Sequence, residues 1–182
     1  MQSLQRRLIL EPTTKPMLLG ITGHRPHKLG GYNDATNRSK AIKLVLKQCF
    51  LQAKPTYIIS GMALGVDQWA VEVALELGIT VMALIPCLAQ DSKWPPASRI
   101  KYINLLDKIT ENNGIIEYVT KEPYSSTCMH LRNQRIIEYS THILAVWDKS
   151  WGGTGGCVRM AKQAGRPLTV VHPVSLEITY DV

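Results

Sequence analysis

Short apolar runs alternate with longer stretches of helical periodicity along most of this sequence. The apolar runs have the length of strands and occupy residues 17–23, 56–60, 80–86, 115–120, 142–148 and 167–173. The stretches with helical spacing lie between them, at residues 39–53, 66–78, 97–112, 130–140 and 157–165. Because the apolar runs have no polar face, the pattern predicts a three-layer α/β fold. We expect a mostly parallel sheet of about six or seven strands, with helices on both faces.

A length of 182 residues is sufficient for one domain with a sizeable core. We therefore expect a single domain over residues 17–182, preceded by a loosely ordered N-terminal arm over residues 1–16. The arm contains Arg6 and Arg7 but no small-residue cleavage pattern, so we do not expect a secretory signal. No apolar run approaches the ~20 residues that a transmembrane helix needs, so no membrane partner is predicted.

Cysteine usage and charge restrict the classes of partner. No two cysteines have the C-x-x-C spacing of zinc sites, and they do not form a disulfide framework pattern. The chain has four cysteines, Cys49, Cys87, Cys128 and Cys157. We expect them to be free thiols, and we expect no bound metal and a cytoplasmic location. The formal net charge of +7 leaves nucleic acid open as a partner. The basic residues are spread along the chain, however, so charge alone does not decide the question.

Unusual residues gather directly after four of the apolar runs. The segments are GHRPHKLGGY (23–32), SGMALGVD (60–67), the loop 87–96 and WDKSWGGTGG (147–156). In a mostly parallel sheet the carboxyl ends of the strands share one edge, and ligands bind there, where the strand order reverses. We therefore expect the four segments to form one site.

Glycines mark two of these segments as candidate phosphate-binding bends. Gly61 and Gly65 would let the backbone approach a ligand closely, and the helix expected from residue 66 would direct its free N–H groups at that ligand. Gly152 and Gly153 form a second such bend, with the Thr154 hydroxyl as an additional donor. Neither segment matches a known phosphate-binding motif, so a plain connection from loop to helix is the alternative interpretation.

Polar residues beside the bends are candidate ligand contacts. Arg25, after Gly23 and His24, either holds a phosphate with its planar guanidinium or pairs with a surface carboxylate. His24 is either a ligand contact or a structural histidine. Asp67 either accepts from a ribose hydroxyl or caps its own helix, and Ser60 has the same two interpretations.

Five further residues complete the candidate set. Trp94, in a proline-flanked loop with Gln90, either stacks on a base or closes the end of the sheet as a lid. Arg132 and Asn133 open the helix expected over residues 130–140, and Arg132 is the strongest charged candidate. Asp148 ends an apolar run, where it either accepts from a ribose, holds the second glycine bend or orients Arg132.

Several of these segments together resemble one protein family. They are SGMALGVDQWAVEVALELG, GHRPHKLGGY, IPC-x-x-Q-x-x-x-W, LRNQRIIEYS and LAVWD followed by GGT, and they resemble the YpsA-like branch of the SLOG superfamily. The resemblance extends from about Gly20 to Pro173 and implies a Rossmann-like domain from a bacterium or phage. It also implies a pocket for a nucleotide or nucleotide-derived small molecule and a homodimer, but no assigned reaction.

Two related families of the superfamily share parts of these motifs. The segment 60–67 is similar to a Ser-Gly-x-Ala-x-Gly-x-Asp segment of the DNA-processing protein A family. The segment 129–132, Met-His-Leu-Arg, is similar to the Met-His-Glu-Arg-Lys pattern of the Lonely Guy phosphoribohydrolases, which places Arg132 at their catalytic arginine. Their second pattern is only partly present, because Gly156 and Cys157 stand where it has acidic residues. This departure argues against hydrolase activity.

Three functions remain open from the sequence. The first is binding of a nucleotide-type ligand for sensing or sequestration. This function needs the glycine bends and Arg25 or Arg132, and it needs no cofactor besides the ligand itself. The second is phosphoribohydrolase-like cleavage of nucleoside monophosphates, which needs a carboxylate beside Arg132; Asp67, Glu72 and Glu138 are the candidates. The third is single-stranded nucleic-acid binding, which needs a continuous basic groove and depends steeply on salt.

Overall fold

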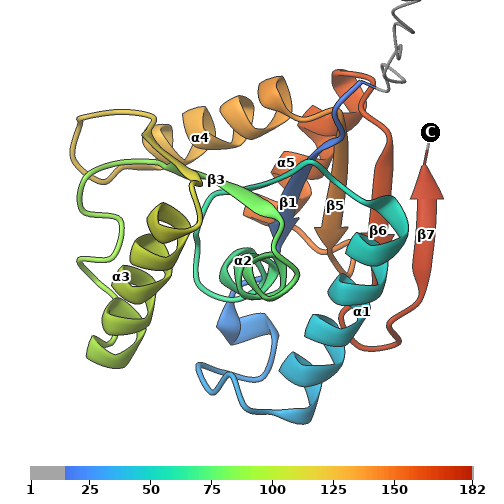
Figure 1. The fold of residues 1–182 in the computed structure, drawn as a ribbon, viewed down its shortest axis with the longest axis horizontal. Coiled ribbons are helices and arrows are strands. Elements are labelled where there is room, and N and C mark those ends of the chain that lie inside the picture. The colour runs from blue at the N-terminus through green and yellow to red at the C-terminus, as the bar shows by residue number, and fades with distance from the viewer. Residues whose placement is uncertain (1–14, 182) are drawn as a thin grey trace, which may run out of the picture.

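Seven strands form one sheet in the part of the chain, residues 15–181, that the computed structural model describes (Figure 1). The strands are β1 (Leu18–Gly23), β2 (Tyr57–Ser60), β3 (Thr80–Ile85), β4 (Ile115–Tyr118), β5 (His142–Val146), β6 (Leu168–Val171) and β7 (Ile178–Asp181). The first six coincide with the six apolar runs. The three-layer Rossmann-like fold with a mostly parallel sheet is therefore confirmed. The arm expected over residues 1–16 falls mainly on residues 1–14, outside the described residues.

β1 lies at the centre of the sheet, whose strand order is β4-β3-β2-β1-β5-β6-β7. From β1 the chain adds β2, β3 and β4 on one side and then returns to add β5 and β6 on the other, all in parallel. The seventh strand, β7, pairs with β6 antiparallel and ends the sheet. The strand order thus reverses between β1 and β5, so their carboxyl ends form the edge where a ligand is expected.

Five α-helices of the described residues cover the two faces of the sheet. They are α1 (Asn37–Ala53), α2 (Val66–Glu76), α3 (Pro96–Glu111), α4 (Ser126–Tyr139) and α5 (Gly153–Gln163). Helices α1, α2 and α3 pack on one face, around a core that includes Trp69, and α4 and α5 pack on the other. A short 3-10 helix, η1 (Pro26–Lys28), follows β1. None of the helices within residues 15–181 is long and apolar enough to span a bilayer.

The helix α4 begins four residues earlier than its sequence pattern predicts, at Ser126 rather than at residue 130. The reason is a cap: the Ser125 side chain accepts a hydrogen bond from the Cys128 amide at 3.1 Å. A cysteine stands where a capping box usually has Glu or Gln, so the sequence signal is weak. Arg132 and Asn133 therefore lie in the second turn of α4 and not at its start.

The helix α5 also begins early, at Gly153 rather than at residue 157. Glycine is a poor helix former, so the GGTGG segment predicts a loop. In the structure, a β-carbon on Gly155 would lie 3.3 Å from the Trp147 ring and 3.1 Å from the Ser150 carbonyl oxygen. The glycine therefore allows the first turn of α5 to pack closely against the loop after β5, and it places Thr154 inside a helix.

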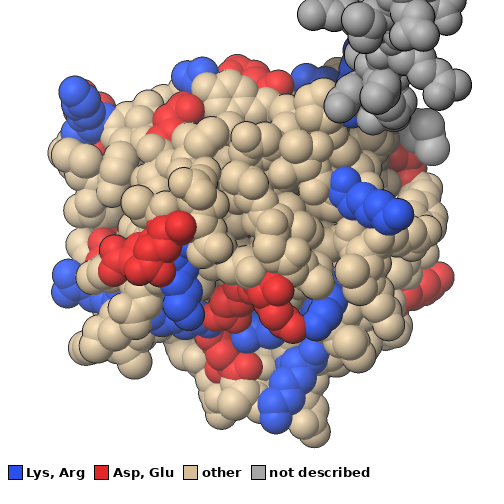
Figure 2. Space-filling view, viewed as in Figure 1, with Lys and Arg blue, Asp and Glu red and all other residues tan. Residues whose placement is uncertain are grey.

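A cluster of ion pairs fastens the loop between η1 and α1 to the neighbouring helices. Asp34 in this loop accepts a hydrogen bond from Trp69 Nε1 at 2.8 Å and pairs with Lys101 of α3. Glu72 of α2 pairs with Lys43 at 2.6 Å and with Lys101 at 2.5 Å. Figure 2 shows acidic and basic side chains interleaved over α1, α2 and α3, so this face carries no patch of a single sign.

Candidate ligand-binding cleft at the carboxyl ends of β1 and β5

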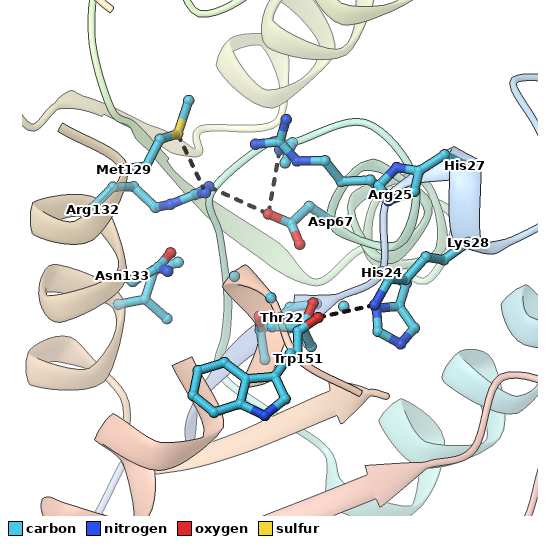
Figure 3. A pocket seen from close by; sticks show the side chains of 17 residues that line it. Thr22, His24, Arg25, His27, Lys28, Asp67, Met129, Arg132, Asn133 and Trp151 are labelled. Carbon is cyan, nitrogen blue, oxygen red and sulfur yellow. Dashed lines mark hydrogen bonds and ion pairs between the residues drawn. The ribbon is translucent and has the colours of Figure 1, made fainter. Parts of the chain in front are cut away.

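A cleft with a volume of about 230 Å³ opens where β1 and β5 end, and we call it the β1–β5 cleft. Its walls come from the loop after β1, from α2 and α4, and from the loop that leads into α5 (Figure 3). Nine of the predicted site residues line it: Gly23, His24, Arg25, Asp67, Arg132, Asn133, Gly152, Gly153 and Thr154. The reversal of strand order thus coincides with a hollow surrounded by polar groups.

Arg132 and Asp67 form a buried ion pair in the β1–β5 cleft. Arg132 Nη1 lies 3.4 Å from Asp67 Oδ2, and each side chain is only 7% exposed. The same carboxylate oxygen accepts a hydrogen bond from the Ala63 amide at 3.3 Å. Burial raises the pKa of the Asp67 carboxyl, while the Arg132 charge and the Ala63 amide oppose that rise. Figure 3 shows the two side chains pointing toward one another from α4 and α2.

The Arg132 guanidinium has more hydrogen-bond donors than acceptors around it. Its Nη1 faces Asp67, and its Nη2 lies 3.9 Å from the Met129 sulfur, which is a weak acceptor. Its Nε is buried and has no hydrogen-bond partner among residues 15–181. Because burying an under-bonded cation is unfavourable, an anion in the cleft would stabilise this side chain.

The bend at residues 61–65 is closed by its own hydrogen bonds. Ser60 Oγ accepts from the Met62 amide at 3.1 Å and donates to the Asp67 carbonyl oxygen at 3.0 Å. The Ala63 amide donates to the Asp67 carboxylate, as described above. The polar groups of Ser60 and Asp67 thus hold the bend together and do not cap α2, whose N-cap residue, Gly65, has no side-chain cap hydrogen bond.

Gly61 and Gly65 make room for neighbouring protein groups. A β-carbon on Gly61 would lie 1.4 Å from Arg132 Nη1, so the guanidinium passes directly over this glycine. A β-carbon on Gly65, where φ is +92°, would lie 2.6 Å from the His24 carbonyl oxygen. That oxygen accepts a hydrogen bond from the Val66 amide at 3.3 Å, so the first amide of α2 is already occupied.

His24 and Asp148 connect the ends of β1 and β5, with His24 Nε2 2.7 Å from Asp148 Oδ1. Burial lowers the pKa of His24, and Asp148 only partly opposes this. Desolvation alone would raise the pKa of Asp148, but hydrogen bonds from Ser150 and His24 outweigh it and lower that pKa. Because an ionised carboxylate can only accept, the neutral imidazole donates from Nε2. Asp148 also accepts from the Ser150 amide at 2.9 Å and so holds the second glycine bend.

The N-terminus of α5 opens toward the β1–β5 cleft. Its N-cap, Gly152, has φ +142°, a conformation that favours glycine, and it has no side chain to cap the helix. The Gly156 amide closes the first turn on the Gly152 carbonyl oxygen at 2.9 Å. The amides before it have no intrahelical acceptor, and Gly153 and Thr154 line the cleft. The helix therefore adds N–H donors and the positive end of its dipole to the cleft wall.

Gln90 and Trp94 line a neighbouring cavity of about 250 Å³, which we call the second cavity. Arg25 and His27 line both hollows, so the second cavity adjoins the β1–β5 cleft across these two residues. The Trp94 ring packs edge-on against Tyr102, with ring centroids 5.2 Å apart. Trp94 is thus partly a cover over the sheet end and partly a cavity wall.

Some residues that line the cleft have no distinctive sequence signal. Trp151 is 84% exposed beside the cleft, with the Arg159 guanidinium 4.9 Å from its ring centroid. Lys28 donates to Ser150 Oγ at 2.5 Å and to the Trp151 carbonyl oxygen at 3.1 Å. These contacts tie the loop after β1 to the loop after β5. Local sequence does not separate Lys28 or Trp151 from ordinary surface residues.

Of the three carboxylates considered for hydrolysis, only Asp67 lies beside Arg132. Glu72 pairs with two lysines in the cluster at α1 and α3, and Glu138 is 62% exposed on α4. Cys157 stands where the hydrolase pattern has an acid, and it is fully buried against Thr22, with a pKa that burial raises to about 11. The described residues contain no group of three His, Cys, Asp or Glu side chains that could hold a metal ion.

Comparison with known sequences identifies the family. The YpsA family model, described as the YspA SLOG family, matches residues 19–169. A UPF0398 protein of Halalkalibacterium halodurans is 30% identical, over 75% of this chain and 75% of the relative. A UPF0398 protein of Bacillus thuringiensis is 28% identical, over 81% of this chain and 84% of the relative.

Comparison with solved structures agrees at the level of the fold. DNA processing protein A from Helicobacter pylori is similar with a TM-score of 0.61 at 22% identity, covering 85% of this chain and 65% of that one. The Streptococcus pneumoniae protein gives 0.59 at 18% identity, covering 86% and 50%. A molybdenum cofactor carrier protein from Chlamydomonas reinhardtii gives 0.53 at 16% identity, covering 86% and 76%. This chain therefore spans about two thirds and one half of the two DNA processing proteins. The family match over most of the chain shows that it belongs to the YpsA family of SLOG proteins.

Proposed function

We propose that this protein binds a nucleotide or nucleotide-derived ligand, with a phosphate group of the ligand in the β1–β5 cleft. The observation that carries the proposal is the state of Arg132. Its guanidinium is buried in the cleft wall, and its Nε has no hydrogen-bond partner in the described part of the chain. A phosphate supplies several acceptor oxygens in a geometry that matches the planar guanidinium, so it would satisfy these donors.

The charges around the cleft also favour an anion. Arg25, His27 and Lys28 line it from the loop after β1, and Arg132 lines it from α4. Asp67 is the acidic residue that lines the same hollow, and its carboxylate is already engaged with Arg132 and the Ala63 amide. The N-terminus of α5 contributes uncharged donors that suit a phosphate. Sensing or sequestration of the ligand requires these groups and no catalytic base.

Mass spectrometry of the freshly purified protein under native conditions tests the proposal directly. We expect a species heavier than the bare chain, and release of a phosphate-bearing metabolite on denaturation. Isothermal titration calorimetry with AMP, GMP, CMP and UMP then measures affinity for added ligand. Absence of both a co-purifying metabolite and any binding of these nucleotides or of ribose 5-phosphate would overturn the proposal.

Substitution of Arg132 links the binding to the cleft. Arg132→Lys keeps the charge but removes the guanidinium geometry, and we expect it to weaken nucleotide binding about tenfold or more. Arg38→Ala is the matched control, because Arg38 is exposed at the start of α1 and lines neither hollow. Since loss of the Arg132 charge alone would leave Asp67 unpaired, the double variant Asp67→Asn, Arg132→Met provides a neutral second test. Unchanged affinity in both variants would refute the role of Arg132.

N-glycosidic hydrolysis is a second candidate, favoured by the position of Asp67 beside Arg132. The Asp67 side chain is 7% exposed and hydrogen-bonded, which is a poor arrangement for a base that must reach a substrate. We therefore expect no release of adenine when the protein is incubated with AMP and the products are separated by chromatography. Adenine release that is lost in Asp67→Asn, with AMP binding retained, would instead identify an enzyme.

Single-stranded nucleic acid is the third candidate, because a structural neighbour of this chain is described by its single-stranded DNA binding mode. The exposed Trp151 ring and the adjacent Arg159 are the features that fit it best. Fluorescence anisotropy with a labelled oligothymidine at low salt distinguishes the two ligand classes. We expect a flat titration, whereas binding that falls steeply with added salt and is lost in Trp151→Ala would favour the polymer.

A further inference from the structure

The second cavity adjoins the β1–β5 cleft but differs from it in chemistry. Three aromatic side chains line it: Tyr32 from the loop after η1, Trp94 from the loop after β3, and Tyr124 from the loop before α4. Tyr32 is 58% exposed and Tyr124 is 42% exposed, so their rings are accessible. The Lys93 ammonium lies 5.5 Å from the centroid of the Tyr124 ring. Flat aromatic walls of this kind suit a planar ring with a π face.

The walls of the second cavity are held in place by contacts outside it. The edge-on contact with Tyr102, at an interplanar angle of 75°, fixes the orientation of Trp94. The loop that carries Tyr32 is fastened by Asp34, which accepts from Trp69 Nε1 and pairs with Lys101. The cavity is therefore built before any ligand arrives, which lowers the entropic cost of binding.

Gln90, which lines this cavity, carries a buried side-chain acceptor. Its side chain is 2% exposed, and its Nε2 donates to the Met62 carbonyl oxygen at 3.2 Å. Because a carbonyl can only accept, the nitrogen end of the amide must face Met62, and Oε1 faces the other way. Oε1 is buried and has no hydrogen-bond partner within residues 15–181.

We infer that the second cavity binds the planar nitrogen heterocycle of the same ligand whose phosphate occupies the β1–β5 cleft. The base stacks against the aromatic walls, and Gln90 Oε1 accepts a hydrogen bond from an N–H group on its edge. Arg25 and His27, which line both hollows, lie at the position of the sugar between base and phosphate. The inference rests on the proposed function and adds that the ligand carries a nucleobase as well as a sugar and a phosphate.

A comparison of nucleotides with ribose 5-phosphate tests the inference on the unmodified protein. Calorimetric titration with AMP, GMP, CMP, UMP and ribose 5-phosphate gives five affinities under one condition. We expect the preferred nucleotide to bind at least about tenfold more tightly than ribose 5-phosphate, because only the nucleotide carries a base. Equal affinities for all five compounds would overturn the base subsite and leave the phosphate cleft standing. Absence of binding by all five would overturn both.

A matched pair of glutamine variants locates the base. Gln90 and Gln68 both donate through Nε2 to the Met62 carbonyl oxygen, at 3.2 and 3.3 Å, and both are buried. Gln90→Leu and Gln68→Leu therefore lose equivalent structural hydrogen bonds, but only Gln90 lines the cavity. We expect Gln90→Leu to weaken the preferred nucleotide about tenfold and to leave ribose 5-phosphate unchanged. Equal effects of the two variants on nucleotide affinity would contradict a direct contact.

An aromatic substitution provides a test that does not disturb the core. Tyr32→Ala removes one wall of the second cavity from an exposed position, and Tyr180→Ala, on β7 and 66% exposed, is its control. We expect Tyr32→Ala to weaken nucleotide binding several-fold, with no change for ribose 5-phosphate and no effect of the control. If Tyr32→Ala leaves nucleotide affinity at the wild-type value, the stacking part of the inference is wrong.

Discussion

Gly61 lies directly beneath the guanidinium of Arg132, so close that a β-carbon at position 61 would stand 1.4 Å from Arg132 Nη1. The glycine that follows β2 therefore determines where the only buried arginine of the described chain can lie. Its role is to admit a protein cation from α4, and the cation in turn faces the β1–β5 cleft.

Gly61→Ala is expected to displace Arg132 and to destabilise the fold by about 1–3 kcal/mol, as overpacking does. Phosphate-bearing ligands should bind at least about tenfold more weakly, because the guanidinium moves. Urea denaturation and calorimetry measure the two effects. Gly156→Ala is the control, since the nearest atom to its β-carbon would be Arg159 Nη2 at 3.9 Å. A Gly61→Ala protein with wild-type stability and affinity would show that the close approach is unimportant.

The pair of His24 and Asp148 predicts a loss of stability in acid. Burial lowers the pKa of His24 from its ordinary value of 6.5, so the unfolded chain binds the proton at a higher pH than the folded chain does. The contribution of neutral His24 to folding stability is therefore lost as pH falls below 6.5. The pKa of Asp148 is lowered from 3.8, so its contribution persists to lower pH and is lost only as pH falls below 3.8. Melting temperature measured between about pH 7 and pH 5 should therefore fall, mainly through His24.

The variant His24→Gln separates this effect from the rest of the chain. Glutamine keeps a donor for Asp148 but does not titrate, so the melting temperature of the variant should vary less between neutral and mildly acidic pH. His130→Gln, at an exposed position on α4, should leave the wild-type profile unchanged. A profile that is the same in wild type and His24→Gln would exclude His24 as its source.

Asp34 is expected to contribute to stability more than an ordinary surface charge. Asp34→Asn keeps an acceptor for Trp69 Nε1 but loses the charge that pairs with Lys101, and should cost about 1–2 kcal/mol of unfolding free energy. Lys47→Ala breaks the exposed pair with Glu76 and should cost less than about 0.5 kcal/mol. Chemical denaturation compares the two. A larger loss of unfolding free energy in Lys47→Ala than in Asp34→Asn would contradict a stabilising role of the ion pairs around Asp34.

The four cysteines should differ sharply in reactivity. Cys49 is half-buried on α1, whereas Cys87, Cys128 and Cys157 are buried. Burial raises the pKa of Cys49 and, to about 11, that of Cys157, so the reactive thiolate is scarce at neutral pH. Titration with Ellman's reagent should label Cys49 slowly in the native protein and all four thiols after unfolding. Rapid labelling of Cys157 would mean that the core beneath α5 opens in solution.

The fold could be predicted from the sequence because the spacing of apolar residues and the residue types indicate the same element in most segments. Six strands and five helices follow from apolar runs and helical spacing, whereas the pairing of β1 with β5 was not predicted. The two early helix starts were not accessible. Cys128 replaces the usual capping-box residue in α4, and the glycines of α5 have low helix propensity, while the close contact of Gly155 with Trp147 is not visible in the local sequence.

The candidate site was only partly accessible for a similar reason. Residues that follow strands, such as His24 and Asp148, were found because a parallel sheet gathers them at one edge. The function of Gly61 depends on Arg132, which lies on another element, and no local pattern reports that contact. Trp151 and Lys28 were missed because their roles come from contacts between two loops that are distant in sequence.

The central position of β1 also has a consequence for how the chain matures. The Leu18 amide donates a hydrogen bond to Thr141, and the Lys28 ammonium donates one to the Trp151 carbonyl oxygen. In each pair the two residues are 123 positions apart in the sequence. During synthesis, one edge of β1 can pair with β2 early, whereas its other edge can pair with β5 only after most of the polypeptide has been synthesised. The hollow that would receive a ligand is therefore among the last parts of the molecule to be completed, and shortened chains that stop before β5 cannot possess it.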